Sequence, residues 1–198
     1  MFQWLPVVSL ALSVVLSAVG AWTDFRTGHI PNWLTLSGIV AGFAIQTLAG
    51  YGHVNLVGYG GLTAMRGLGA ALVGTLVCAL VPMVMFYKEI ARKDGTTQHV
   101  SGGGDLKLFA AQGALLGYFH GVELQFFAFC AAGVFGMARL AWHGRLLQSL
   151  TNTLFILFNP VLPKRWRREI TAELLTPMRI GGAILAGTVM SVLARQPF

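Results

Sequence analysis

Residues 101–107 have the sequence SGGGDLK, in which three glycines lead directly into Asp105. An apolar run follows at 108–119, interrupted only by Gln112 and small residues. A carboxylate at the start of a membrane helix is energetically costly and is usually retained for function. Asp24 has a similar position at the end of the apolar run 2–22. The two carboxylates are therefore the first candidates for functional residues.

The composition indicates a membrane protein. Of the 198 residues, 55% are hydrophobic and 11% are charged, and the mean hydropathy is +0.67. Soluble domains have about a quarter charged residues, so this chain has too little polar surface to be one. A net charge of +7 is compatible with nucleic-acid binding, but the basic residues lie between apolar runs, where membrane topology explains them. We expect contacts with membrane lipids and none with nucleic acid.

Six apolar segments predict an all-α polytopic membrane protein, with about six transmembrane helices in a single domain, 1–198. A helix needs about 20 apolar residues to cross a bilayer. Pro31 begins the second segment, which is a favourable place for proline. No basic residue precedes Arg26, so we favour a retained first helix over a cleaved signal peptide. The segments are 2–22, 31–49, 62–87, 105–120, 122–142 and 177–194.

The segment 145–172 has a different pattern. Its leucines recur at helical spacing among polar residues, and prolines then precede a basic patch at 164–168. This pattern predicts an amphipathic helix in the cytoplasmic membrane interface, followed by a basic segment near anionic head groups. A spanning or re-entrant helix at 146–162 is the alternative.

The basic residues are strongly biased to one side of this topology. If the first loop is cytoplasmic, only Arg66 and Arg195 lie on the opposite side. Such a bias places both termini in the periplasm, and Asp24 and Asp105 on the same, cytoplasmic side. The basic residues on or near that side are Arg26, Lys88, Arg92, Lys93, Lys107, Arg139, Arg145, Lys164, Arg165, Arg167, Arg168 and Arg179.

Two carboxylates that share a site are suited to acid–base hydrolysis. They cannot both ionise cheaply, so one stays protonated while the other is charged. The charged partner takes a proton from water, and the protonated partner polarises a peptide carbonyl. The glycines before Asp105 would let a substrate backbone approach closely. Lys107 points away from Asp105 on a helix, where it would face head groups or contact substrate.

Each of these features also has an ordinary structural explanation. Asp105 after glycines suits a helix N-cap, and Asp24 could be a flanking charge. His29 and His99 are more typical of loop residues than of ligands, and no two histidines have helical metal-ligand spacing. The two cysteines lie inside apolar runs and form no CxxC pair. We expect no metal and no cofactor.

Two sequence motifs carry a resemblance to a known family. Residues 24–32, DFRTGHIPN, are similar to the D-x-x-x-x-x-I-P-N signature of type IV prepilin peptidases. Residues 102–105, GGGD, match the GxGD motif of that family, and the following Leu-Lys-Leu resembles its usual continuation. The resemblance covers 22–110 and resumes at 176–187. Chain length and motif spacing resemble the short branch that serves Flp/Tad-type pili.

The resemblance implies an aspartic endopeptidase of the bacterial inner membrane. It would cleave the basic leader of prepilins at the cytoplasmic face, typically after a glycine, with Asp24 and Asp105 as the catalytic pair. Longer members also methylate the new N-terminus through a domain with paired CxxC motifs, so we expect no methyltransferase activity here. Components of the pilus or secretion assembly are further expected partners. The residues expected to shape the site or bind substrate are Gly102, Gly103, Gly104, Lys107, Arg26, Pro31 and Asn32.

Two other classes of function use the same residues differently. A small transporter would use Asp24 and Asp105 as a proton or cation relay. The sequence shows no internal repeat, however, and both aspartates lie at the ends of apolar segments. A non-catalytic assembly factor of a secretion system would tolerate conservative changes at both positions.

Overall fold

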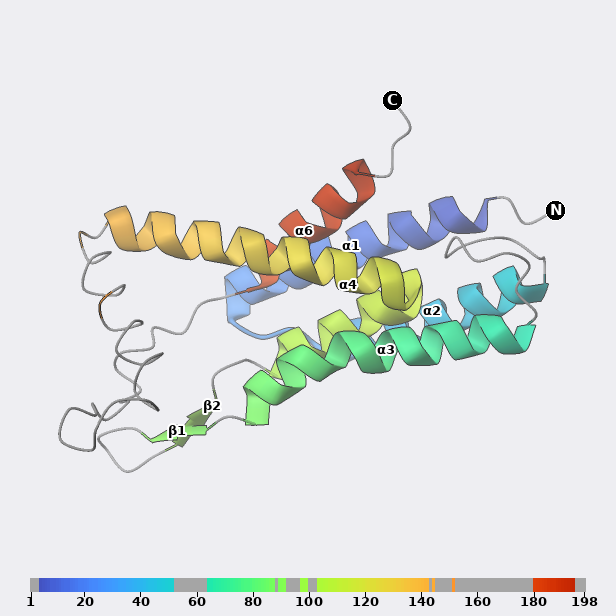
Figure 1. Ribbon diagram of the computed structural model, residues 1–198, viewed down its shortest axis with the longest axis horizontal. Helices are drawn as coiled ribbons and strands as arrows, with labels where there is room; N and C mark the ends of the chain where they lie inside the picture. The colour runs from blue at the N-terminus through green and yellow to red at the C-terminus, as the bar shows by residue number, and fades with distance from the viewer. Residues whose placement is uncertain are drawn as a thin grey trace.

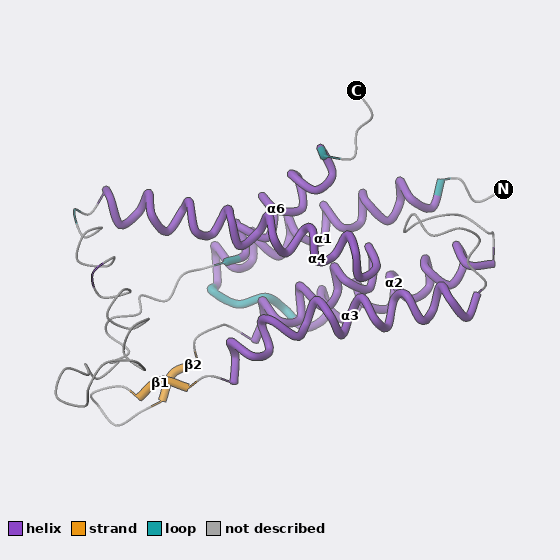
Figure 2. Tube along the Cα trace, viewed as in Figure 1, coloured by secondary structure: helices purple, strands orange, loops and turns teal. Residues whose placement is uncertain are grey.

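The chain folds into a bundle of long helices (Figures 1 and 2). A computed structural model describes residues 4–51, 64–87, 89–91, 97–99, 103–142, 144, 151 and 180–194. Two three-residue strands, β1 (Glu89–Ala91) and β2 (Thr97–His99), pair antiparallel. The helices are α1 (Leu5–Thr27), α2 (Asn32–Tyr51), α3 (Ala64–Tyr87), α4 (Gly103–Trp142) and α6 (Gly181–Leu193).

Apart from the turn at 28–31 and single residues next to helix ends, the described residues are helical or belong to the β1–β2 hairpin, which the predicted all-α fold did not include. Four helices, α1 to α4, are long and apolar enough to cross a membrane. The chain is therefore a multi-pass membrane protein, and its exposed large hydrophobic side chains face outward, where lipid would cover them. The predicted count of six is not confirmed. Helix α6 has 13 residues, fewer than the roughly 20 that span a bilayer. Apart from Thr151, the predicted interfacial helix at 145–172 lies outside the described residues.

Helix α4 is a hairpin of two arms rather than one straight rod. Gly117 has φ 74° and ψ 175°, a left-handed conformation that suits glycine. The first arm (103–116) and the second arm (118–142) run in opposite directions in Figure 1. A Cβ on Gly121 would lie 3.2 Å from the Cα of Gly113, which is possible only if the chain turns back. The predicted break between the segments 105–120 and 122–142 thus lies at Gly117.

Polar side chains of other helices reach the backbone near this turn. The Leu115 carbonyl lies two residues before Gly117, where the regular helical hydrogen bonds are interrupted. It accepts hydrogen bonds from Ser9 Oγ (2.6 Å) on α1 and Gln46 Nε2 (3.0 Å) on α2. Buried backbone carbonyls need partners, most of all in lipid. These two side chains therefore help to stabilise the reversal.

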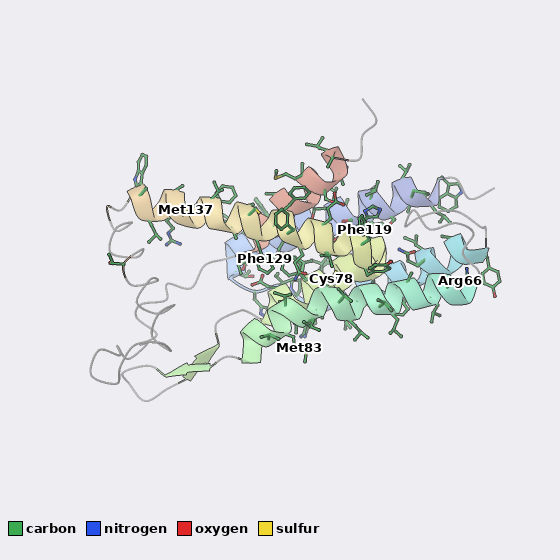
Figure 3. The ribbon with its side chains drawn as sticks, viewed as in Figure 1. Arg66, Cys78, Met83, Phe119, Phe129 and Met137 are labelled. Atoms are coloured by element: carbon green, nitrogen blue, oxygen red, sulfur yellow. The ribbon has the colours of Figure 1, made fainter. Side chains whose placement is uncertain are left out.

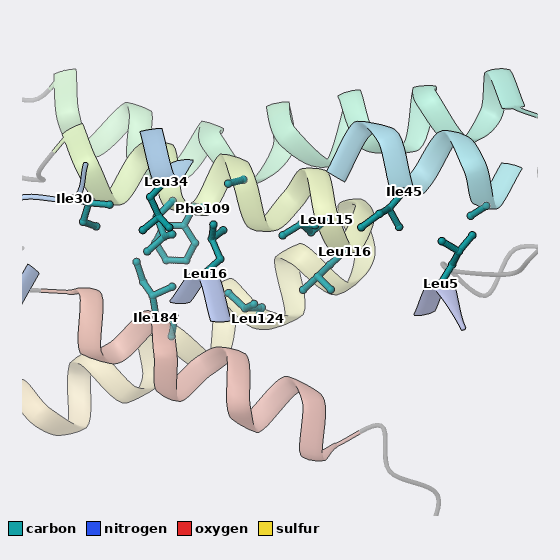
Figure 4. Packing of buried hydrophobic residues seen from close by; sticks show 14 residues of the cluster. Leu5, Leu16, Ile30, Leu34, Ile45, Phe109, Leu115, Leu116, Leu124 and Ile184 are labelled. Carbon is teal, nitrogen blue, oxygen red and sulfur yellow. The ribbon is translucent and has the colours of Figure 1, made fainter. Parts of the chain in front are cut away.

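A buried hydrogen-bond chain joins α1, α4 and α6. Gln112 Nε2 donates to Ser17 Oγ (2.6 Å), which lies 2.8 Å from Thr188 Oγ1. Thr188 Oγ1 donates to the Ile184 carbonyl, so Ser17 is the donor to Thr188. Ser13 Oγ donates to Gln112 Oε1 (2.5 Å). Figure 4 shows buried apolar side chains of the same helices, including Leu16, Phe109 and Ile184, which form the core.

Replacing Gln112 is expected to destabilise the bundle measurably. Gln112→Met keeps the side-chain length but leaves Ser13 and Ser17 without their amide partner. Hydrogen bonds between membrane helices contribute about 0.6 to 1.7 kcal/mol, so we expect a loss of about 1–2 kcal/mol. Thermal unfolding in detergent micelles measures it. Gln125→Met is the matched control, because the one hydrogen bond described for Gln125 is the one to the Cys78 carbonyl. Equal losses in the two variants would contradict the role of this network.

Candidate active site

Asp24 lies on the buried face of α1, in its last turn. The helix continues to Thr27, five residues beyond the predicted apolar run 2–22, so Asp24 lies inside it and not at its end. Gly28 ends the helix with φ 68°, and its N–H donates to the Asp24 carbonyl at 2.9 Å. This is a common glycine C-cap. Because Ser17, Gly20 and Asp24 share the buried face, the Asp24 side chain points into the bundle and is only 8% exposed.

Asp105 lies in the first turn of α4, after Gly103 and Gly104. It is also 8% exposed. Gly104 packs against Ile30, since a Cβ at this position would lie 3.1 Å from the Ile30 Cβ. The two sequence motifs, 24–32 and 102–105, are therefore in contact in the fold.

The two carboxylates lie at the same end of the bundle. The C-terminal end of α1 and the N-terminal end of α4 meet there, as Figure 1 shows. The charge of Asp24 acts electrostatically on the Asp105 carboxyl. The arrangement has the composition needed for acid–base catalysis with one proton on the pair.

The turn between α1 and α2 is also linked to α4 by a side-chain hydrogen bond. Lys107 Nζ donates to Asn32 Oδ1 at 2.7 Å, and both residues are exposed. Pro31, half-buried, lies directly before the first residue of α2. Lys107 therefore points toward the 24–32 motif and not only toward solvent.

Arg26 is a predicted site residue that points away from the carboxylates. The Arg26 guanidinium lies 4.7 Å from the centre of the Trp22 ring, on the exposed side of α1. This is a cation–π contact, directed away from the buried face that carries Asp24. Gly102 lies outside the described residues, as do Pro177 and Arg179.

Gly181, the first residue of α6, was not predicted as a site residue. Its N–H donates to Asp24 Oδ2 at 3.1 Å. The only signal in the sequence was the glycine-rich start of the last apolar segment. Its contact with Asp24 spans 157 residues of chain, which no local pattern reveals.

Among the residues that the structure describes, no three His, Cys, Asp or Glu side chains gather in a way that could hold a metal ion. The described site is thus built from two carboxylates, glycine backbone and the Lys107–Asn32 pair.

One comparison with known proteins gives a match. The family described as the type IV leader peptidase family matches residues 10–137, which is more than half of the chain. The matched region runs from α1 into the second arm of α4 and includes both Asp24 and Asp105. No curated protein and no solved structure matches the chain significantly.

Proposed function

Because the chain belongs to the type IV leader peptidase family, we propose that it is a membrane-embedded aspartic endopeptidase with Asp24 and Asp105 as its catalytic pair. The observation that carries this proposal is the pairing of two buried carboxylates at one end of the bundle. Asp24 lies in the last turn of α1 and Asp105 in the first turn of α4, so the proposal places both carboxylates near the membrane boundary, where the leader of a substrate would enter. The reaction proposed is hydrolysis of one peptide bond in the leader of a type IV prepilin of the Flp-like branch.

The first step forms the tetrahedral intermediate. The charged carboxylate takes one proton from water, and the water oxygen bonds to the carbonyl carbon of the scissile peptide. The protonated carboxyl gives its proton to the carbonyl oxygen, which becomes a hydroxyl. The negative charge thus moves from one carboxylate to the other, and no free hydroxide or oxyanion is formed.

The second step breaks the peptide bond. The carboxyl that received the proton from water gives it to the leaving nitrogen, and the carbon–nitrogen bond breaks. A hydroxyl of the intermediate returns its proton to the other carboxylate as the new carboxylic acid forms. Both aspartates then have their starting protonation, and one water has been consumed.

The cytoplasmic face is the proposed location of the site. Lys107 and Arg26 lie at the end of the bundle that carries the carboxylates, and Arg139 is close to the end of α4. Figure 3 shows Arg66 at the opposite end from Met137. This bias follows the positive-inside rule for bacterial inner-membrane proteins. A reporter that is active only in the periplasm, fused after Phe198, is expected to be active.

A prepilin fits this site physically. Its hydrophobic helix would lie in the lipid beside the exposed apolar side chains of the bundle, and its basic leader would remain at the cytoplasmic interface. The junction between leader and helix would then lie at the depth of Asp24 and Asp105. The charged carboxylate attracts the basic leader, whereas Lys107 and Arg26 oppose it.

Reconstitution of the purified chain with a Flp-type prepilin in liposomes tests the proposal. We expect a shorter pilin and a free leader, with the cut identified by mass spectrometry. An intact prepilin, under conditions in which a known leader peptidase cleaves it, would refute the proposed function. Uptake of protons or cations without cleavage would favour a transporter, and neither activity would favour an assembly factor.

The Lys107–Asn32 hydrogen bond is expected to affect turnover more than stability. Exposed pairs contribute under about 1 kcal/mol, but this pair joins the α1–α2 turn to the helix of Asp105. We expect Lys107→Met and Asn32→Ala each to lower kcat about three- to tenfold, with no further loss in the double variant. Ser37→Ala, whose hydroxyl bonds only within α2, is the control and should retain full kcat. Multiplying effects in the double variant would contradict the link.

A further inference from the structure

The start of α6 contacts Asp24 through backbone alone. Helix α6 has no side-chain cap at Ile180, and the first N–H groups of any helix lack partners within the helix. The Gly181 N–H donates to Asp24 Oδ2, so a carboxylate from α1 partners one of these groups. Helix N-termini carry partial positive charge, and a carboxylate placed there is favoured in its charged form.

The contact requires glycine at position 181. A Cβ on Gly181 would lie 2.8 Å from Asp24 Oδ2 and 2.9 Å from Asp24 Cβ. The second of these atoms is fixed to the α1 backbone and cannot rotate away. Any side chain here would therefore move either the Asp24 carboxylate or the start of α6. Gly182, by contrast, is exposed, and a Cβ there would meet nothing within 4 Å.

A second hydrogen bond fixes the register of the two helices. Ser17 lies seven residues before Asp24, and Thr188 lies seven residues after Gly181. Their hydroxyl oxygens are 2.8 Å apart and buried. Because seven residues are about two helical turns, both contacts lie on the same seam between antiparallel α1 and α6. This seam holds Gly181 at the height of Asp24.

Asp105 has no equivalent support within the described residues. No described N–H or O–H group donates a hydrogen bond to its carboxyl, and Asp24 is the described charge that acts on it. The two nearby cations are directed elsewhere, since Arg26 lies over Trp22 and Lys107 donates to Asn32. The two carboxyls therefore differ in their surroundings, and the asymmetry favours negative charge on Asp24.

We propose that the start of α6 belongs to the active site, with Gly181 as a positioning residue that holds Asp24 as the charged, water-activating partner. Asp105 is then the partner that carries the proton to the peptide carbonyl. This inference rests on the proposed aspartic peptidase function and assigns the two roles that it leaves open. It also explains why a short helix distant in sequence packs against the last turn of α1.

The kinetic test compares neighbouring glycines in the reconstituted cleavage assay. Gly181→Ala is expected to lower kcat at least tenfold while KM changes less than twofold, because Asp24 is displaced and the substrate surface is not. Gly182→Ala is expected to match the wild type in both constants. Thr188→Val, which removes the second contact of the seam, should lower kcat at least threefold. If Gly181→Ala does not accumulate in the membrane, Thr188→Val decides. The inference would be overturned if Gly181→Ala, or Thr188→Val in its place, kept the wild-type kcat or changed KM alone.

A second measurement does not depend on activity. Hydrogen–deuterium exchange of the peptide that contains Gly181 should accelerate at least tenfold in Asp24→Ala and remain unchanged in Asp105→Ala. Unchanged exchange in Asp24→Ala, or equal acceleration in both variants, would overturn the anchoring by α6. If the wild type cleaves no prepilin but the exchange result holds, the proposed function fails and the contact stands. If the wild type cleaves and the exchange result fails, only the inference is lost.

Discussion

Asp24→Asn and Asp105→Asn are each expected to lower kcat for prepilin cleavage by about a hundred- to ten-thousand-fold, the range of general acid–base catalysis. Asparagine has nearly the same shape as aspartate but neither takes up nor releases a proton in this pH range. In Asp24→Asn the new amide oxygen could still accept the Gly181 N–H, so the packing of α6 should survive. The loss should therefore appear in kcat, with little change in substrate affinity.

The double variant should be no slower than the slower single variant. Residues that act as one unit have strongly non-additive effects, because either loss already removes the shared step. Glu123→Gln is the control, since it makes the same chemical change in the same helix. Glu123 lies on the second arm of α4, where it contacts His120 (3.3 Å). Steady-state cleavage in liposomes gives both constants. Normal turnover by either single variant would exclude an acid–base role for that aspartate.

Stability measurements separate this catalytic effect from misfolding. Asp24 and Asp105 are both buried, and the charge of one acts on the other. Asparagine has nearly the shape of aspartate and adds no charge to a poorly solvated site, so neither substitution should lower the unfolding temperature. A variant that is inactive yet at least as stable as the wild type would locate the defect in the chemistry. If a variant is inactive and also strongly destabilised, hydrogen–deuterium exchange of the peptide that contains Gly181 tests the geometry of the site instead.

The sequence predicted well the features that depend on local pattern. Apolar runs of sufficient length predict spanning helices because lipid leaves the backbone no other partner, and α1, α2 and α3 lie close to the predicted segments. The helix ends were less accurate. Helix α1 continues past the apolar run to Thr27, because Gly28 and not the loss of hydrophobicity ends it. Asp24 consequently lies on a buried helical face.

Long-range contacts were beyond local pattern. The sequence predicted a break between the segments 105–120 and 122–142, but nothing in it distinguishes Gly117 from the neighbouring glycines as the point of reversal in α4. The β1–β2 hairpin lies in a hydrophilic connection with no alternation of apolar residues. The bond from Gly181 to Asp24 joins helices 157 residues apart. The sequence identified both carboxylates because each is placed at the end of an apolar segment, where a charge is energetically costly. It did not identify the Gly181 N–H, the backbone group that distinguishes Asp24 from Asp105.

The crossing of α3 with the first arm of α4 is the second feature with a large expected effect. A Cβ on Gly113 would collide with the Gly74 carbonyl oxygen, and a Cβ on Gly74 would collide with the Gly113 carbonyl oxygen. The two backbones touch directly, without side chains between them. In lipid, such close packing is a main source of the free energy of helix association, because burying apolar surface against another helix contributes little there. Asp105 lies in the first turn of the same arm, so this crossing also fixes one half of the site.

Gly113→Ala is therefore expected to destabilise the bundle by about 3 kcal/mol, the upper end of the usual cost of overpacking, or to prevent accumulation. The added methyl group meets a backbone atom that cannot rotate, so α3 and α4 must separate along the crossing. Gly133→Ala in the same helix is the matched control, because its Cβ would meet nothing within 4 Å; it should be neutral or slightly stabilising through higher helix propensity. Unfolding temperatures in micelles, with membrane accumulation, measure both. Equal stability of the two alanine variants would mean that α3 and the first arm of α4 do not meet backbone to backbone, and the placement of Asp105 would need another support.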